Sequence, residues 1–215
     1  MRYVEIGEAR ELYHAGDAAH DFDHVLRVVA MASFIARAEG ADEEVVGMAA
    51  LLHDVPSDAE RGNHHLAAAD FAARLLTERG MQPERVANVA HCIRSHRFRD
   101  RSEPPVTLEA MCLYDADKLD SMGAMGVARA FAFAGAHGNR LWTESVDAIG
   151  ESDQLPGGRD YTPVHEFVFK LSRLQATLHT AAGQRLGEQR QQSMAAYFAE
   201  LDREMQSITA VERRL

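Results

Sequence analysis

A chain of 215 residues, 46% of them hydrophobic, is long enough to bury one sizeable core, so we expect a single domain. The formal net charge of −10 argues against nonspecific binding to DNA, RNA or anionic lipid, and we expect no nucleic-acid or membrane partner. A small anionic substrate is not excluded, because a bound metal and a few basic side chains can make one positive pocket.

Targeting signals are not apparent in the chain. No apolar run reaches the ~18 residues of a membrane-spanning helix. The first ten residues contain Arg2, Glu5 and Glu8 instead of the apolar stretch of a signal peptide. The two cysteines, Cys92 and Cys112, lie in apolar helical segments, which is typical of buried free thiols in a reducing compartment. We therefore expect a cytoplasmic protein.

Helical periodicity dominates, and no alternating strand pattern is convincing, so we predict an all-α fold. The predicted helices cover residues 22–39, 42–54, 65–80, 83–96, 107–134 and 163–205. Asp42 is expected to cap the second helix and Pro83 to begin the fourth. Gly40 and Gly80 are expected to end the first and third helices.

Residues 150–162 interrupt this pattern with several glycines and polar side chains. They predict a long loop, which is either a lid or simply a mobile segment. The helix that follows, residues 163–205, carries many apolar side chains and is expected to pack back on the rest of the chain. We see no internal repeat and no domain boundary.

The dipeptide His53-Asp54 ends a segment, residues 45–52, that is apolar nearly all round and is therefore predicted to be buried. His53 follows the core-facing stripe of this segment. Asp54 places a negative charge at a helix C-terminus, where the helix dipole opposes it. A metal ion would stabilise both side chains. Alone, such a dipeptide is usually a satisfied core histidine beside a solvated aspartate.

Two further positions carry polar side chains on apolar helical faces. His24 lies near a helix start, on one face with Val28, Met31 and Ile35. A lone histidine there is usually structural.

Asp117 belongs to the acidic run at residues 115–120 and shares its face with apolar and small residues. Asp120 lies beside Asp117, one turn later. Charge runs on helices are usually solvated, but this one interrupts an apolar segment.

Together these residues form the order His24, His53-Asp54, Asp117, which resembles the H…HD…D pattern of the HD superfamily of metal-dependent phosphohydrolases. The surrounding sequences are also similar: Asp-His-Val-Leu-Arg-Val, Ala-Ala-Leu-Leu-His-Asp and Asp-Ala-Asp-Lys-Leu-Asp. The C-terminal part looks like the small stand-alone bacterial HD hydrolases. The resemblance implies one HD-domain helical bundle over residues 1–215, with a metal-binding core at about 20–135.

The resemblance implies one divalent ion held by His24, His53, Asp54 and Asp117. Such ligands suit Mn²⁺, Mg²⁺, Fe²⁺, Co²⁺ or Ni²⁺, with Zn²⁺ as an alternative. The expected reaction is attack of a metal-activated water on phosphorus. Asp54 or Asp120 is the candidate proton acceptor, Asp58 is another, and the sequence does not choose.

Several basic side chains are candidates for contact with a phosphorylated substrate. Lys118 follows the metal aspartate directly and is expected to act in catalysis as well as in binding. The other candidates are Arg27, His65, His96 and Arg99. A solvated basic patch around His96 is an equal alternative. Eight of the eleven histidines precede residue 97. We nevertheless expect one metal ion and not two. The two-metal phosphodiesterases carry a consecutive His-His or His-Glu pair at the second position of the pattern, and we do not find that pair here.

The expected substrate is a nucleotide or a related small phosphate compound. Some members of the similar stand-alone subgroup are nucleoside triphosphate pyrophosphohydrolases. The alternatives are a di-iron oxygenase on the same fold, which needs a second metal, and a nucleotide-binding regulatory module without turnover. No Gly-rich phosphate loop is present to identify the base or sugar. A homodimer is left open.

Overall fold

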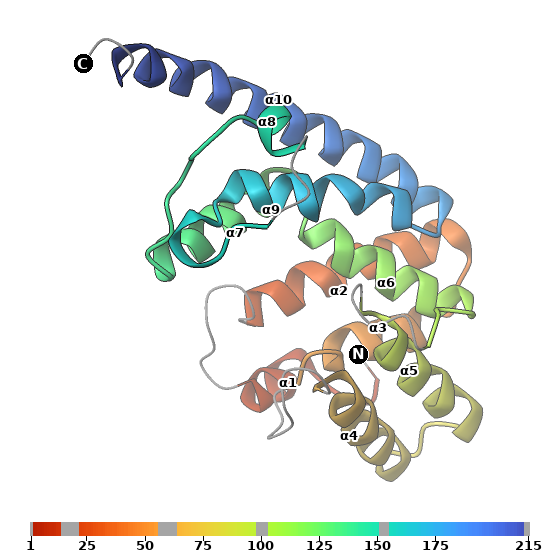
Figure 1. Cartoon of the computed structure of the whole chain (residues 1–215). Helices are drawn as coiled ribbons and strands as arrows, with labels where there is room; N and C mark the ends of the chain where they lie inside the picture. The colour runs from red at the N-terminus through yellow and green to blue at the C-terminus, as the bar shows by residue number, and fades with distance from the viewer. Residues whose placement is uncertain (1, 14–21, 56–63, 98–102, 151–154, 213–215) are drawn as a thin grey trace. The chain divides into compact units, whose positions relative to one another are not determined.

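The computed structural model describes residues 2–13, 22–55, 64–97, 103–150 and 155–212, with side chains up to Ser207. Every regular element within these ranges is a helix, as Figure 1 shows. The predicted all-α fold is therefore confirmed over the described residues.

The α-helices are α1 (Ile6–Leu12), α2 (Phe22–Glu39), α3 (Glu43–Leu52), α4 (His64–Glu78), α5 (Pro83–Ser95), α6 (Leu108–Asp120), α7 (Gly123–Ala136), α8 (Val146–Gly150), α9 (Pro163–Phe169) and α10 (Ala181–Glu212). Short 3₁₀ turns form η1 (Gly158–Asp160), η2 (Leu171–Arg173) and η3 (Gln175–Thr177).

The chain groups into two compact units. The first contains residues Met1–Asp120 and Leu178–Arg185, and the second contains Ser121–Thr177 and Leu186–Leu215. All the predicted ligands and substrate contacts belong to the first unit by sequence. The predicted domain extent, 1–215, and the packing of the C-terminal helix on the core stay predictions.

Helix α3 is the centre of the first unit, and it contacts α2, α5 and α6. Its residues from Val45 to Leu52 are all buried, as their apolar composition predicts. Asp42 caps this helix as predicted, because its side chain accepts hydrogen bonds from the amides of Glu44 and Val45 at 3.0 and 3.2 Å. The cap and the buried face together fix where α3 ends, and therefore where His53 and Asp54 lie.

Two predicted helices are wrong in extent. Residues 107–134 form α6 and α7, separated at Ser121 and Met122. Gly126 permits this break, because a Cβ atom there would lie 2.3 Å from the carbonyl oxygen of Ser121. Residues 163–205 contain α9, two 3₁₀ turns and part of α10 instead of one helix. Helices α1 and α8 were not predicted. The described part of the predicted loop 150–162 contains the last residue of α8, Gly150, and the turn η1, while residues 151–154 lie outside the described residues.

Asp115, the first member of the acidic run, anchors the start of α10 within the first unit. Its carboxylate accepts hydrogen bonds from the His179 amide at 2.8 Å and from the Thr180 amide and hydroxyl at 2.7 and 2.6 Å. Burial raises the pKa of Asp115, although the bonds from Thr180 and His179 favour its charged form. Thr180 in turn accepts from the Gly183 amide at 2.9 Å. This aspartate therefore has a structural role.

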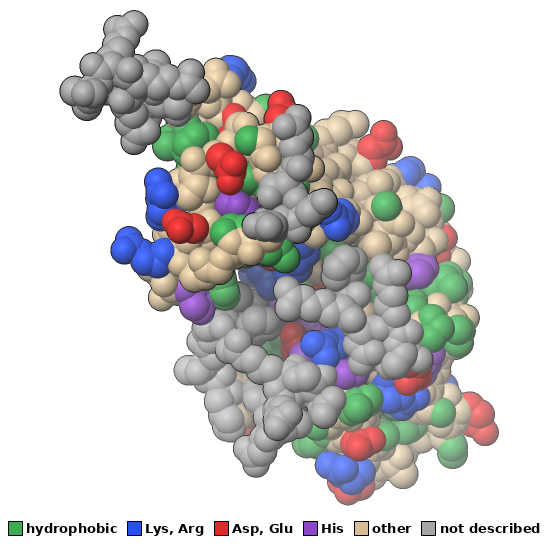
Figure 2. All heavy atoms as spheres, viewed as in Figure 1, with side chains coloured by type: hydrophobic (Ala, Val, Ile, Leu, Met, Phe, Trp, Pro, Cys, Tyr) green, Lys and Arg blue, Asp and Glu red, His purple; other side chains and the backbone are tan. Residues whose placement is uncertain are grey.

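The described residues contain no helix that is both long enough and apolar enough to cross a membrane. Figure 2 shows Lys and Arg side chains interspersed with Asp and Glu side chains over the described part of the face that it presents.

The contact between Asp115 and the start of α10 leads to a stability prediction. A Cβ atom on Gly183 would lie 2.3 Å from Asp115 Oδ2 and 2.8 Å from Thr180 Oγ1. Gly183→Ala should therefore force these hydrogen-bonded groups apart and lower the free energy of unfolding by about 1–3 kcal/mol. Gly7→Ala is the matched control, because nothing lies within 4 Å of its Cβ position. Urea unfolding of both variants measures the difference, and equal stability would contradict the assigned contact.

Candidate metal centre

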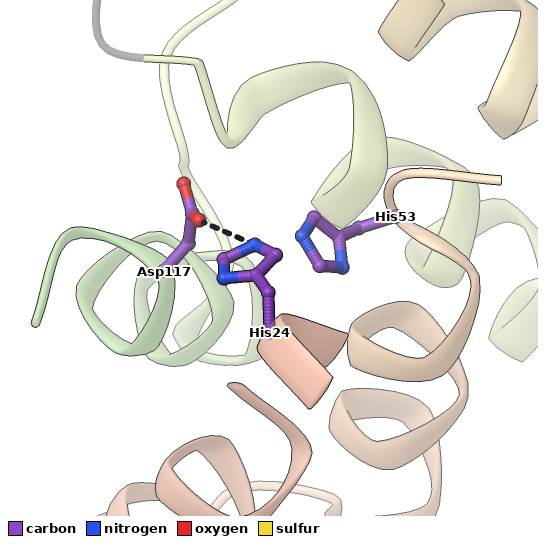
Figure 3. A group of neighbouring side chains, drawn as sticks. All are labelled: His24, His53 and Asp117. Atoms are coloured by element: carbon purple, nitrogen blue, oxygen red, sulfur yellow. Dashed lines mark ion pairs between the residues drawn. The ribbon is translucent and has the colours of Figure 1, made fainter. Parts of the chain in front are cut away.

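Three polar side chains from three helices point toward one another in the first unit (Figure 3). His24 comes from the first turn of α2, His53 follows the end of α3, and Asp117 lies on α6. One donor atom from each lies within 4.8 Å of the others. His24 Nε2 is 3.5 Å from Asp117 Oδ1. Donors bound to one ion at about 2.0–2.6 Å are separated by distances of this order, so the three can share a divalent cation.

The two imidazole rings are oriented by hydrogen bonds at their far nitrogens. His24 Nδ1 lies 2.7 Å from Asp120 Oδ2, and His53 Nδ1 lies 2.8 Å from the carbonyl oxygen of Ala50. A carboxylate and a carbonyl can only accept, so each Nδ1 carries the proton. In the neutral rings, Nε2 therefore presents a lone pair to the cluster. This arrangement is the usual outer support of a metal-binding histidine.

Asp54 lies between two pairs of histidines. Its Oδ2 is 3.8 Å from His24 Nε2 and 3.5 Å from His53 Nε2. Its Oδ1 is 3.5 Å from His64 Nε2 and 3.8 Å from His96 Nε2. The structure thus brings all four predicted ligands together. It also forms a second donor group of His53, Asp54 and His96.

Two buried polar atoms in this cluster test whether a cation fits. His53 Nε2 and Asp54 Oδ1 are buried and make no hydrogen bond of ordinary geometry within the described residues. A buried polar atom without a partner is costly, and two of them in one cluster need an explanation. Both atoms are strong metal donors. The residues present therefore fit a divalent ion.

The electrostatics of the cluster keep its ligands in the form that binds a cation. Burial opposes ionisation of Asp54, but the nearby His53 and His64 outweigh it and hold the pKa of Asp54 well below its usual value. Burial likewise opposes the charge of Asp117, but Lys118 and the histidines lower its pKa strongly. Burial lowers the pKa of His96 to about 3, so this imidazole is neutral near pH 7.

Lys118 and Asp120, which the sequence placed in catalysis, have defined partners. Lys118 is buried, forms an ion pair with the Asp117 carboxylate and lies 5.1 Å from the Tyr114 ring centroid. Asp120 is buried and binds His24. It also accepts from Arg27 Nε at 2.7 Å and from Arg27 Nη2 at 3.1 Å. Both Asp120 oxygens are engaged, so the geometry favours a positioning role for Asp120 over that of a general base.

The other predicted substrate contacts lie in different environments. Arg27 is directed to Asp120, and its side chain is 34% exposed. His65 is buried at the start of α4. His96 lies among the candidate metal donors instead of apart from them. Arg99 and Asp58 lie outside the described residues.

His64 is the residue near the cluster that the sequence did not single out. It begins α4, and its Nε2 approaches Asp54. The only signal for it was the adjacent pair His64-His65, and its place beside Asp54 depends on how α4 packs.

The contact between His24 and Asp120 leads to a prediction for metal affinity. Asp120→Asn keeps the shape of the side chain but removes the charge that holds His24 in its donor orientation. We expect the dissociation constant for Mn²⁺ to rise about 10–100-fold, the usual cost of losing an outer-shell partner. Asp23→Asn is the matched control, since Asp23 is exposed on the same helix beside His24. Titration calorimetry on both metal-free variants measures the effect, and a wild-type constant for Asp120→Asn would exclude the positioning role.

Comparison with known proteins places this cluster in a family. The family model for the HD domain matches residues 21–122, which include all four predicted ligands. The chain is similar to the uncharacterized protein YpgQ of Bacillus subtilis, with 32% identity over 196 residues, 90% of this chain and 88% of that protein.

Solved structures agree with this assignment. The crystal structure of Bacillus subtilis YpgQ in complex with ADP is similar with a TM-score of 0.73 and 30% identity, covering 94% of this chain and 98% of that chain. An HD-superfamily hydrolase from Bacillus thuringiensis has a TM-score of 0.71 and 27% identity, covering 94% of each chain. The predicted family and fold are confirmed: the chain belongs to the HD-domain family, alongside these small bacterial proteins.

Proposed function

We propose that this protein is a divalent-metal-dependent phosphohydrolase that acts on a nucleotide or a related small phosphate compound. The observation that carries the proposal is the pair of buried donors, His53 Nε2 and Asp54 Oδ1, that have no hydrogen-bond partner within the described residues. Membership of the HD family and the similarity to an HD-superfamily hydrolase support a hydrolase. The ADP complex of YpgQ supports a nucleotide ligand.

His24, His53, Asp54 and Asp117 would hold the ion, which supplies Lewis-acid chemistry toward a phosphorus centre when bound. Mn²⁺ is our first choice, although the donor set suits Mg²⁺, Fe²⁺, Co²⁺ and Ni²⁺ as well. Asp120 and the Ala50 carbonyl keep the two imidazoles in the donor tautomer. These residues fix the site before a substrate arrives, which avoids reorganisation during the reaction.

Asp54 is the residue we assign to proton transfer. With one Asp54 oxygen bound to the ion, the other would be available to accept the proton of an attacking water. His64 and His96 lie 3.5 and 3.8 Å from Asp54 Oδ1. Because the pKa of His96 is about 3, this ring is neutral near pH 7 and does not compete as a cation for the carboxylate.

Lys118 is the cation we assign to the phosphate groups. It is buried and pairs with Asp117. A phosphate oxygen approaching the same cluster would meet a charge that is already in place. His65, His96, Arg27 and Arg99 remain the other proposed substrate contacts. A nucleoside triphosphate is the substrate to examine first, with release of pyrophosphate as the expected outcome.

The test is a screen of nucleotides and phosphate esters with Mn²⁺ and product identification. We expect hydrolysis by the wild type, none after chelation, and recovery when Mn²⁺ is restored. Asp54→Asn should lower turnover by about 10²–10⁴-fold, the usual contribution of general acid–base catalysis, or more if the ion is also lost. Asp160→Asn is the control, because this carboxylate is exposed and pairs with Arg140 in the second unit. Metal binding without turnover of any compound would favour a regulatory module instead.

A second candidate is a di-iron oxygenase, and one observation favours it. His53, Asp54 and His96 form a second possible donor group, which a second ion could use. The two donor groups share His53, however, and a single imidazole Nε2 binds one ion. We therefore keep one ion per chain as the prediction.

Counting the metal separates the two candidates. Elemental analysis of protein saturated with Mn²⁺, and separately with Fe²⁺, should give about one ion per chain. Two iron atoms per chain together with oxygen consumption would contradict the phosphohydrolase and support the oxygenase. Asp117→Asn is the reference variant for this count. Asp117 belongs only to the donor group with His24 and His53, so the substitution removes a ligand from that group alone.

A further inference from the structure

Tyr13, which follows α1, reaches the end of α3 from a distant part of the sequence. Its hydroxyl donates a hydrogen bond to the carbonyl oxygen of Leu51 at 2.9 Å. The last carbonyls of a helix have no partner within the helix. Here Ala50 O accepts from His53 Nδ1 at 2.8 Å, and Leu52 O accepts from the Val55 amide at 3.4 Å. Tyr13 therefore supplies a partner for the Leu51 carbonyl, on the turn that leads to the two proposed metal ligands.

The same hydroxyl also lies within electrostatic reach of the Asp54 carboxylate. Burial raises the pKa of Tyr13 well above its usual value, and the charge of Asp54 raises it further. The phenol is therefore protonated and can donate.

The ring of Tyr13 makes a second connection, to the helix that carries His24. Its centroid lies 5.3 Å from that of Phe22, the first residue of α2. Phe22 is buried, and the Arg10 guanidinium lies 4.5 Å from its ring centroid. His24 follows two residues later. One side chain therefore contacts both segments that supply the imidazoles.

We propose that Tyr13 is a positioning residue for the metal centre: it holds the His53-Asp54 turn against the start of α2. The proposal rests on the proposed metal site but not on the substrate. A purely structural Tyr13 would affect stability alone. A positioning Tyr13 also affects affinity, because the donor atoms must lie close to their binding geometry before the ion arrives.

Tyr13→Phe tests this directly, since it removes the hydroxyl and keeps the ring. We expect a folded protein whose dissociation constant for Mn²⁺ rises about 10-fold, the lower end of the cost of an outer-shell change. Tyr161→Phe is the matched control. It removes one tyrosine hydrogen bond, 2.6 Å to Glu166, in the second unit. It should leave the constant unchanged.

Phe22→Leu provides a second variant, which removes the aromatic partner of Tyr13 but leaves its hydroxyl. We expect an affinity for Mn²⁺ between those of the wild type and Tyr13→Phe.

Circular dichroism establishes that each variant is folded, and calorimetry on metal-free protein gives the dissociation constants for Mn²⁺. If either folded variant binds Mn²⁺ as the wild type does, the proposal for Tyr13 is overturned. If the wild type itself binds no Mn²⁺, the metal site and the proposed function fail with it.

Discussion

Two carboxylates and several imidazoles share one small, largely shielded volume, and this is the constraint on which the first unit depends. Asp54 and Asp117 are only 16% and 15% exposed, and their neighbours His24 and His53 are buried. Bringing charges and polar atoms out of water is costly unless each finds a partner. Two atoms, His53 Nε2 and Asp54 Oδ1, find none of ordinary geometry within the described residues. A divalent cation bound among these side chains would remove this cost.

Residues outside the cluster determine that the donors face inward. Asp120, itself held by Arg27, orients His24, while the end of α3 orients His53 through Ala50. Tyr13 binds the same helix end from a segment 38 residues earlier. These contacts are chemically ordinary. Their effect is to remove rotational freedom from the donors, so that binding an ion need not also order them.

The histidine–aspartate order and the apolar helical faces were sufficient to predict the core of this site. His53 and Asp54 follow a segment whose composition requires burial, and Asp42 marks where that helix begins. The extents of α6 and α10 were not predictable in the same way. Their boundaries depend on contacts such as Gly126 with Ser121 and Asp115 with Thr180, and these contacts involve tertiary packing.

The positions of the remaining histidines were also not predictable from the sequence, because they too depend on tertiary packing. His64 and His96 are 32 positions apart in the printed sequence and approach Asp54 only because α4 begins, and α5 ends, beside it. Nothing in their immediate sequence separates a ligand from a substrate contact. Tyr13 carries no motif at all. Its proposed role follows from a hydrogen bond to a carbonyl at a helix end. Such carbonyls have no partner within the helix, and a donor from any part of the chain can bind them.

The most direct measurement of the central claim is anomalous X-ray scattering from crystals of the protein grown with Mn²⁺. The account predicts one anomalous peak within about 2.0–2.6 Å of His24 Nε2, His53 Nε2 and a carboxylate oxygen of each of Asp54 and Asp117. A fully occupied peak bound elsewhere, or no peak among these four side chains at saturating Mn²⁺, would contradict it.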